Sequence, residues 1–224
     1  MKNLCLTVCM FLSLVTFGEK KYKLVEIGTN LGIIKVKLYA NTPKHSENFL
    51  KLVKAKHYDN LLFHRVIQDF MVQGGASDSR GAEPGKMLGM SDPGYTIGAE
   101  LNPENHHFKG ALAAARQGDE VNPEKRSSGE QFYIVQGRTY TDRELDQIEK
   151  RKQRISKQPF RFDPEVREMY KSVGGAPFLD GDYTVFGEVV EGMDILDKIA
   201  AVETDSRDRP KEDVVILKMK LKRK

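Results

Sequence analysis

Residues 63–75 of this 224-residue chain hold the side chains best suited to chemistry. Arg65 brings a guanidinium that stays charged and can polarise a bound group without transferring a proton. Phe70 and Met71 offer apolar surface, and Gln73 adds an amide that both donates and accepts hydrogen bonds. Taken singly, however, Phe70 and Met71 would be ordinary core residues and Arg65 a surface ion-pair partner. The residue types alone therefore leave a binding site and a structural role open.

The histidines do not have the spacing of a metal site. His106 and His107 are adjacent, and neighbours on an extended chain point in opposite directions, so they seldom bind one ion. His45 and His57 lie on or at the end of one predicted helix, without a nearby acidic cluster. We interpret His64, inside a predicted strand, as structural. The sequence predicts no metal site and no cofactor.

The segments that must position these residues are mostly β. Apolar residues alternate with lysine at 34–38 and again at 215–221, which predicts two strands with one dry face each. Glycine-rich turns separate five shorter predicted strands, at residues 62–66, 70–73, 111–115, 131–135 and 184–188. Because the two long strands bracket all the others, we expect them to pair and close a barrel.

Two helices are predicted beside these strands. Thr42 followed by Pro43 is the pattern of an N-cap with proline at the first helical position, so a helix should begin there and reach about His57. A second helix should follow Gly192, with apolar residues on one side.

Residues 138–175 interrupt the β pattern with a helical and highly charged sequence. Thr141 and Glu144 have the spacing of a capping box, and a second short helix should open near Asp163 and end at paired glycines. A segment of about 38 residues buries too little surface to fold alone. We therefore interpret it as a helical insertion in a single domain of residues 19–224.

The order of several short blocks resembles one protein family. The segment 63–75 reads FHRVIQDFMVQGG, which resembles the central signature of the cyclophilin family of peptidyl-prolyl cis/trans isomerases. Further blocks similar to that family follow in order: Gly110–Arg116, Ser128–Ile134, Phe178–Gly181 and Val185–Gly187. The resemblance implies a mainly β fold, a closed eight-stranded antiparallel barrel capped by two helices, with the active site on the barrel's outer surface.

The resemblance implies an enzyme that accelerates rotation about the peptide bond before proline. Amide resonance holds that bond near-planar, and its uncatalysed isomerisation takes tens of seconds or longer. In the twisted transition state the prolyl nitrogen has a free lone pair, which the Arg65 guanidinium can meet, and an interaction made only there accelerates the step. The resemblance assigns substrate contacts to Phe70, Met71, Gln73, Ala115, Arg116, Gln131, Tyr133, Phe178, Leu179 and Tyr183.

Three of these positions depart from the commonest family pattern. Phe178 stands where many members have a tryptophan associated with cyclosporin binding, so weaker drug binding is implied. Tyr133 replaces a phenylalanine of the proline pocket and adds a hydroxyl that needs a partner or an opening to water. Tyr183 stands where a histidine often lines the pocket rim. Because the expected mechanism transfers no proton, that exchange should alter substrate fit more than chemistry.

The N-terminus differs from the rest of the chain. An uncharged, mostly apolar run at residues 3–18 is shorter than the ~20 residues needed to cross a bilayer. We interpret residues 1–18 as a signal peptide cut before Glu19, with a buried strand or a retained anchor as the alternatives. Cys5 and Cys9 would be removed with it. We expect an exported protein of the periplasm or cell envelope, without stable membrane insertion after processing.

Composition and charge limit the partners. A net charge of +4 in a chain that is 30% charged indicates a mixed surface rather than the basic face that nucleic-acid binding requires. We expect a monomer that acts on proline-containing polypeptides and unfolded exported proteins. The alternative is a non-catalytic module that holds such peptides in the same groove, although a pure binder has no need of Arg65. The insertion, anchored beside the expected pocket, should lengthen the groove and select among protein clients.

Overall fold

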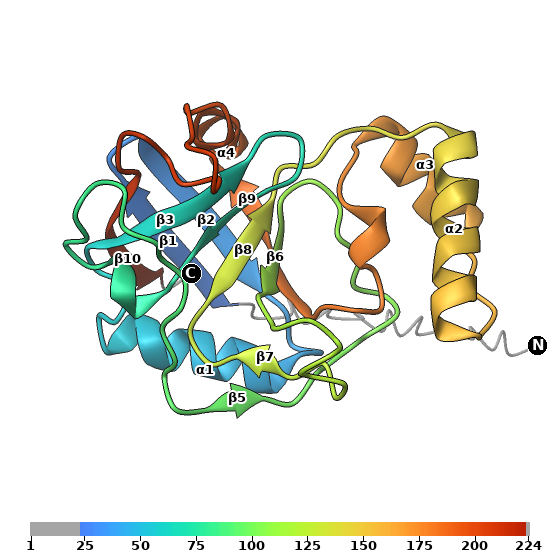
Figure 1. Ribbon diagram of the computed structural model, residues 1–224, viewed down its shortest axis with the longest axis horizontal. Helices are drawn as coiled ribbons and strands as arrows, with labels where there is room; N and C mark the ends of the chain where they lie inside the picture. The colour runs from blue at the N-terminus through green and yellow to red at the C-terminus, as the bar shows by residue number, and fades with distance from the viewer. Residues whose placement is uncertain (1–22, 223–224) are drawn as a thin grey trace, which may run out of the picture.

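The computed structural model describes residues 23–222 (Figure 1). Eight strands close an antiparallel barrel in the order β1-β10-β3-β4-β8-β6-β9-β2, which confirms the expected fold class. Their bounds are β1 (Lys23–Thr29), β2 (Gly32–Leu38), β3 (Leu61–Ile67), β4 (Met71–Gly74), β6 (Ala111–Ala114), β8 (Phe132–Val135), β9 (Val185–Glu191) and β10 (Val215–Lys222). Two short strands, β5 (Thr96–Ile97) and β7 (Ser127–Ser128), form a separate sheet.

The barrel closes through a strand that the sequence analysis did not include. β1 pairs with β10 on one side and with β2 on the other, so the predicted pairing of residues 34–38 with the C-terminal strand is wrong. In β1 only Val25 and Ile27 are buried apolar side chains. Two buried residues within seven are a weak alternation, and this strand therefore left little signal.

Two helices cover the ends of the barrel, as expected. Helix α1 (Pro43–Lys54) lies at the lower end in Figure 1 and α4 (Met193–Ala200) at the upper end. Phe49 of α1 contacts Phe132 edge to face, with ring centroids 5.5 Å apart, and Leu196 of α4 is fully buried in the same core. Each such apolar side chain contributes about 1.5–3 kcal/mol when it leaves water, so the helices fix the strands that carry the site.

Helix α1 begins where predicted, but a different residue caps it. Thr42 occupies the N-cap position and its side chain makes no capping hydrogen bond. The backbone amides of Lys44 and His45 instead donate to the Glu100 carboxylate at 3.1 and 3.0 Å. A carboxylate at a helix N-terminus also meets the positive end of the helix dipole. A residue distant in sequence thus does the work expected of Thr42.

The insertion, residues 138–175, holds helices α2 (Asp142–Ser156) and α3 (Pro164–Ser172) and lies to one side of the barrel (Figure 1). The predicted capping box is present: the Glu144 amide donates to the Thr141 hydroxyl, and the Thr141 amide donates to the Glu144 carboxylate. Tyr140, Leu145, Phe162 and Tyr170 form a small core of its own.

The chain leaves the insertion by a close backbone contact that requires glycine. Gly175 has φ +151°, and a Cβ there would lie 2.2 Å from the carbonyl oxygen of His107. Ring contact between Tyr170 and Phe108, with centroids 4.8 Å apart, adds a second attachment. The insertion is therefore joined to the loop that precedes β6.

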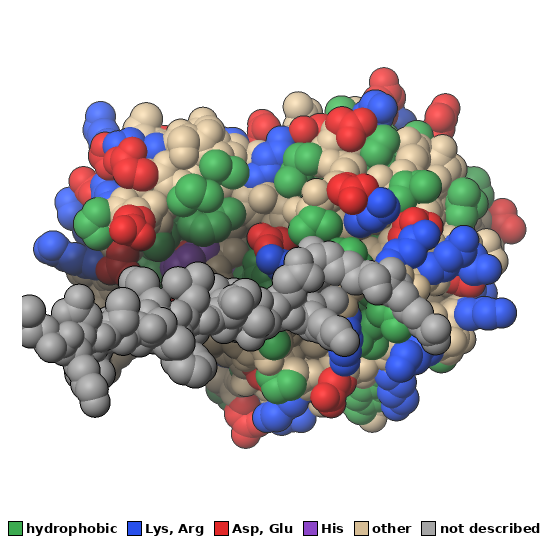
Figure 2. All heavy atoms as spheres, turned by 180° about the vertical axis from the view of Figure 1, so that it is seen from behind, with side chains coloured by type: hydrophobic (Ala, Val, Ile, Leu, Met, Phe, Trp, Pro, Cys, Tyr) green, Lys and Arg blue, Asp and Glu red, His purple; other side chains and the backbone are tan. Residues whose placement is uncertain are grey.

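On the face shown in Figure 2, basic and acidic side chains are interspersed over much of the described surface. Of the helices in residues 23–222, none combines the length and the apolar character needed to cross a bilayer. The predicted signal peptide, residues 1–18, lies outside the described residues.

Candidate active site

Neighbouring residues of the strands point to opposite faces, and this separates the site from the barrel interior. Val72, Leu112 and Ile134 belong to the main core. Met71 and Tyr133, next to them in sequence, belong to a second apolar cluster. Because successive strand side chains alternate between faces, this second cluster lies on the outside of the barrel.

A cavity of about 110 Å³ opens in this outer cluster. Its walls come from strands β3, β4 and β8 and from the segments after β6 and before β9. Nine of the eleven predicted site residues line it: Arg65, Phe70, Met71, Gln73, Ala115, Arg116, Tyr133, Leu179 and Tyr183. Met71 and Tyr133 are almost fully buried, so these walls are held rigidly by the barrel.

The other two predicted residues lie just outside this cavity. Gln131 accepts a hydrogen bond from Gln73 Nε2 at 3.0 Å and donates to the carbonyl of Gly89. It therefore supports Gln73 from behind. Phe178 packs against Phe70 with ring centroids 5.3 Å apart and remains 39% exposed at the rim.

Arg65 is held by a residue that sequence analysis missed. Its Nε donates to the Asp208 carboxylate at 3.2 Å, and both side chains are partly exposed. Gln73, which was expected to hold Arg65, stands opposite it across β3 and β4 but bonds to Gln131 instead. Asp208 thus holds the guanidinium at Nε, and the terminal nitrogens of Arg65, which lines the cavity, make no hydrogen bond or ion pair with residues 23–222.

Only part of the main chain beside the cavity is free to form hydrogen bonds with a bound peptide. The Ala115 amide donates to the Gln131 carbonyl, and the Ala115 carbonyl accepts from the Ser128 amide. The expected peptide-aligning role of Ala115 is therefore already occupied in part by bonds within the protein. In residues 23–222 the Arg116 N–H and C=O make no hydrogen bond, which leaves them for a bound peptide.

The Tyr133 hydroxyl finds a partner in the protein. It lies 3.0 Å from His107 Nε2, and His107 Nδ1 lies 2.8 Å from the Asp180 carboxylate. Since a carboxylate only accepts, His107 Nδ1 donates to Asp180, and with the proton on Nδ1 the Nε2 atom can accept a hydrogen bond from the Tyr133 hydroxyl. Burial raises the pKa of Tyr133 well above its usual value, which keeps the hydroxyl protonated. Its oxygen is thus turned away from the substrate side.

Asp180 is the centre of this network. Its carboxylate accepts from Tyr170 of α3 at 2.7 Å and lies 2.9 Å from His106 Nδ1. Burial by itself would raise the pKa of Asp180, but the hydrogen bonds from His106, His107 and Tyr170 outweigh it and hold that pKa below its usual range. The expectation that His106 and His107 point apart is wrong, because they lie in an irregular loop and both reach one carboxylate.

Tyr183 at the rim is fixed by a cation. The Arg116 guanidinium lies 4.4 Å from the centroid of the Tyr183 ring, within the range of a cation–π contact. Arg116 also donates to the Asp182 carbonyl at 2.8 Å.

Within residues 23–222, no group of three or more His, Cys, Asp or Glu side chains could hold a metal ion.

Comparison with known proteins identifies the family. The family model described as cyclophilin type peptidyl-prolyl cis-trans isomerase/CLD matches residues 24–221. The chain belongs to this family. A Staphylococcus epidermidis protein named as a peptidyl-prolyl cis-trans isomerase is 37% identical over 193 residues, which cover 86% of this chain and 88% of that one. The protein is a peptidyl-prolyl cis/trans isomerase of the cyclophilin type.

Other similar proteins differ in length or in source. A Streptococcus pyogenes protein, named as a bifunctional phosphatase/peptidyl-prolyl cis-trans isomerase, is 36% identical over 197 residues, and this cyclophilin spans 37% of its length. A crystal structure of a Cryptosporidium parvum cyclophilin has the same fold, with a TM-score of 0.64, 22% identity, and coverage of 91% of this chain and 99% of that one. A second structure of the parasite protein was obtained in the presence of the dipeptide Ala-Pro.

Proposed function

We propose that this cyclophilin turns over X-Pro bonds in proline-containing polypeptides, with the proline ring in the 110 Å³ cavity and Arg65 as the catalytic residue. One observation carries the proposal. Nine residues from separate segments meet around one cavity, and Arg65, one of the two arginines among them, is held by a hydrogen bond from its Nε to Asp208. The Ala-Pro dipeptide used with the parasite protein is a ligand of the same chemistry.

The proposed mechanism follows from the electronic change at the prolyl nitrogen. In the planar ground state its lone pair is delocalised into the carbonyl group, and it accepts a hydrogen bond poorly. In the twisted state the lone pair is localised, and an Arg65 N–H donates to it. No proton is transferred and no bond breaks. Each ~1.36 kcal/mol of stabilisation made only in that state raises the rate tenfold.

The rest of the pocket would supply position. Met71, Tyr133 and Leu179 are buried and offer a rigid apolar slot for the proline ring. The Gln73 amide, braced by Gln131, and the free Arg116 main-chain groups can hold the substrate backbone. A preformed slot reduces the ordering cost of bringing the X-Pro bond to Arg65.

Catalysis is tested by measuring isomerisation of short X-Pro tetrapeptides together with peptide binding. We expect turnover well above the uncatalysed rate and saturable binding. Binding without acceleration would instead support a non-catalytic module that holds proline-containing peptides in the same groove.

We further propose that the protein is a monomer that acts on exported proteins in the periplasm or cell envelope. The short apolar run at residues 3–18 supports this proposal. Protein recovered from the cell envelope should begin at or within a few residues of Glu19 and elute at the mass of one chain. An intact Met1 on soluble cytosolic protein would contradict it.

A further inference from the structure

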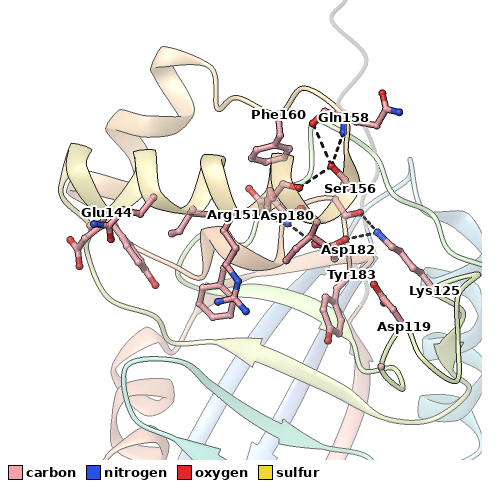
Figure 3. Close-up of a pocket in the computed structure, with 18 of the residues that line it drawn as sticks. Asp119, Lys125, Glu144, Arg151, Ser156, Gln158, Phe160, Asp180, Asp182 and Tyr183 are labelled. Atoms are coloured by element: carbon pink, nitrogen blue, oxygen red, sulfur yellow. Dashed lines mark hydrogen bonds and ion pairs between the residues drawn. The ribbon is translucent and has the colours of Figure 1, made fainter.

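A second and larger hollow, of about 1290 Å³, lies between α2 and the pocket side of the barrel (Figure 3). It shares Phe70, Arg116 and Tyr183 with the proline pocket, so these three residues form a common rim between the two spaces. We call it the insertion groove. A polypeptide with its proline in the pocket can continue into this groove across the shared rim.

One part of the insertion groove is apolar and exposed. Ile155 of α2 is 65% exposed and Phe178 is 39% exposed, and both line the groove. Ile148 and Phe160 lie there as well and are partly buried. Large apolar side chains gathered around a hollow indicate a binding surface more often than scattered ones do.

The other feature of the groove is one cation without a partner. Four of its five basic side chains are in ion pairs: Arg116 with Asp119, Lys125 and Lys152 with Asp182, and Arg138 with Glu144. Arg151 is the fifth. Among residues 23–222 no carboxylate lies within ion-pair distance of it, and Figure 3 shows its side chain directed from α2 toward the barrel.

The remaining carboxylates of the groove make no ion pair with Arg151. Asp180 is bonded to His106, His107 and Tyr170. Glu144 and, more weakly, Asp69 raise the pKa of Arg138, which places the charge of Asp69 near that other arginine. Arg151 of α2 is therefore the basic side chain of the groove that has no ion-pair partner among residues 23–222.

We propose that the insertion groove binds the part of the polypeptide substrate next to the proline, and that it favours a segment carrying an acidic side chain beside an apolar one. The acidic group would pair with Arg151, where a guanidinium can hold both carboxylate oxygens. The apolar side chain would pack on Phe178 and Ile155. This inference rests on the proposed function, because the occupant is the chain whose proline fills the pocket. An extended chain advances about 3.3 Å per residue, so four residues on one side of the proline span roughly 13 Å.

The test compares peptides that share one X-Pro core and carry Glu, Gln or Lys at each of the four flanking positions on either side. For the wild type we expect kcat/KM to be about five-fold higher for Glu than for Lys at one or more positions on one side, as for a partly exposed ion pair. Arg151→Glu should reverse this order. The Glu-to-Lys ratio is taken within each enzyme, so differences in active fraction cancel.

The matched control is Lys150→Glu, which makes the same charge change at the next residue of α2, where the side chain does not line the groove. It should keep the wild-type ratio. A ratio lost equally in both variants would show a general field effect and overturn the inference. Self-association of the wild type that disappears in Arg151→Glu would also overturn the inference, because the groove would then bind a second copy of this chain and not the substrate. If the wild type turns over the peptides without any charge preference, the inference about the insertion groove is wrong and the proposed function stands. If no peptide is turned over, the proposed function itself is wrong.

Discussion

Arg65 touches the rest of the protein through one edge of its guanidinium. The bond to Asp208 uses Nε, and the terminal nitrogens remain for the substrate. We expect Arg65→Ala to lower kcat/KM by a factor that corresponds to ~3 kcal/mol of transition-state stabilisation, which is the usual cost of losing a preorganised donor. The affinity for the peptide should fall much less. The kcat/KM of Arg65→Lys should also be low, because an ammonium group cannot bond to Asp208 through one nitrogen and to the substrate through another in the geometry of a planar guanidinium.

The matched control for Arg65 is Arg207→Ala, which removes an exposed arginine that does not line the pocket. Its kinetics should equal those of the wild type. If Arg65→Ala weakened binding and rate equally, Arg65 would be holding the ground state instead.

The Tyr133 hydroxyl serves the protein rather than the substrate. In Tyr133→Phe the His107 Nε2 would lose its partner at a fully buried site. An unsatisfied buried group costs about 1–3 kcal/mol, so urea unfolding should show a loss of that size while tetrapeptide kcat/KM changes little. Tyr183→Phe is the control, since that hydroxyl has no hydrogen-bond partner within residues 23–222. A large fall in kcat with unchanged stability would place the hydroxyl in the reaction.

The motif at residues 63–75 predicted four of the nine residues that line the cavity, and the rest of the family resemblance predicted the other five. It could not predict Asp208, which meets Arg65 from 143 positions away. The role of His107 was missed for a similar reason, although Tyr133 carried a signal: a hydroxyl placed in an apolar wall requires a partner. Local patterns report which face a residue occupies, whereas such contacts depend on how distant loops pack.

At the scale of elements, we expect the barrel to fold without the helices of the insertion. Its helices have their own small core and attach through Lys152, which bonds to Asp180 and Asp182, and through Tyr170 and Gly175. Replacing residues 139–171 with a short Gly/Ser linker should leave tetrapeptide turnover within a few-fold of wild type. The same variant should slow the proline-limited refolding of a protein substrate, because a longer chain would lose the insertion groove.

Circular dichroism of this variant shows whether the barrel persists. Collapse of tetrapeptide turnover in a folded variant would mean that the insertion is part of the active site itself.

The sequence analysis missed contacts and elements whose stability comes from elsewhere in the chain. The helix at Pro43 was predicted by local capping rules, yet its amides bond to Glu100 rather than to Thr42. The strand β1 was missed because its register depends on β2 and β10 on either side. In contrast, the capping box of α2 is entirely local, and it was predicted correctly.

For the whole molecule, the stability of the fold should depend on pH through a buried histidine. Burial lowers the pKa of His64 to about 4, below the value of ~6.5 in an unfolded chain. Between about pH 4 and pH 6.5, the unfolded chain binds a proton at His64 that the folded chain does not bind. The contribution of His64 to the free energy of unfolding is therefore fully present above about pH 6.5, and roughly 3 kcal/mol is lost as the pH falls to about 4.

Urea unfolding of wild type and His64→Gln across this range checks the expectation, and the difference between the two free energies of unfolding should shrink steadily on acidification. His45 contributes in the same direction in both proteins, since burial lowers its pKa despite the pairing with Glu100. Parallel pH profiles would show that His64 is not the group responsible.

Asp180 has a further consequence, because one carboxylate serves two parts of the molecule. It accepts from Tyr170 of α3 and from His107, which in turn holds the pocket wall at Tyr133. Local opening of α3 would strip a donor from a buried charge, so the opening equilibrium and the ligand equilibrium are thermodynamically linked and must change each other by the same factor. A peptide bound at the proline pocket should accordingly slow hydrogen–deuterium exchange of the α3 amides. Those amides then report occupancy of the pocket without any measurement of catalysis.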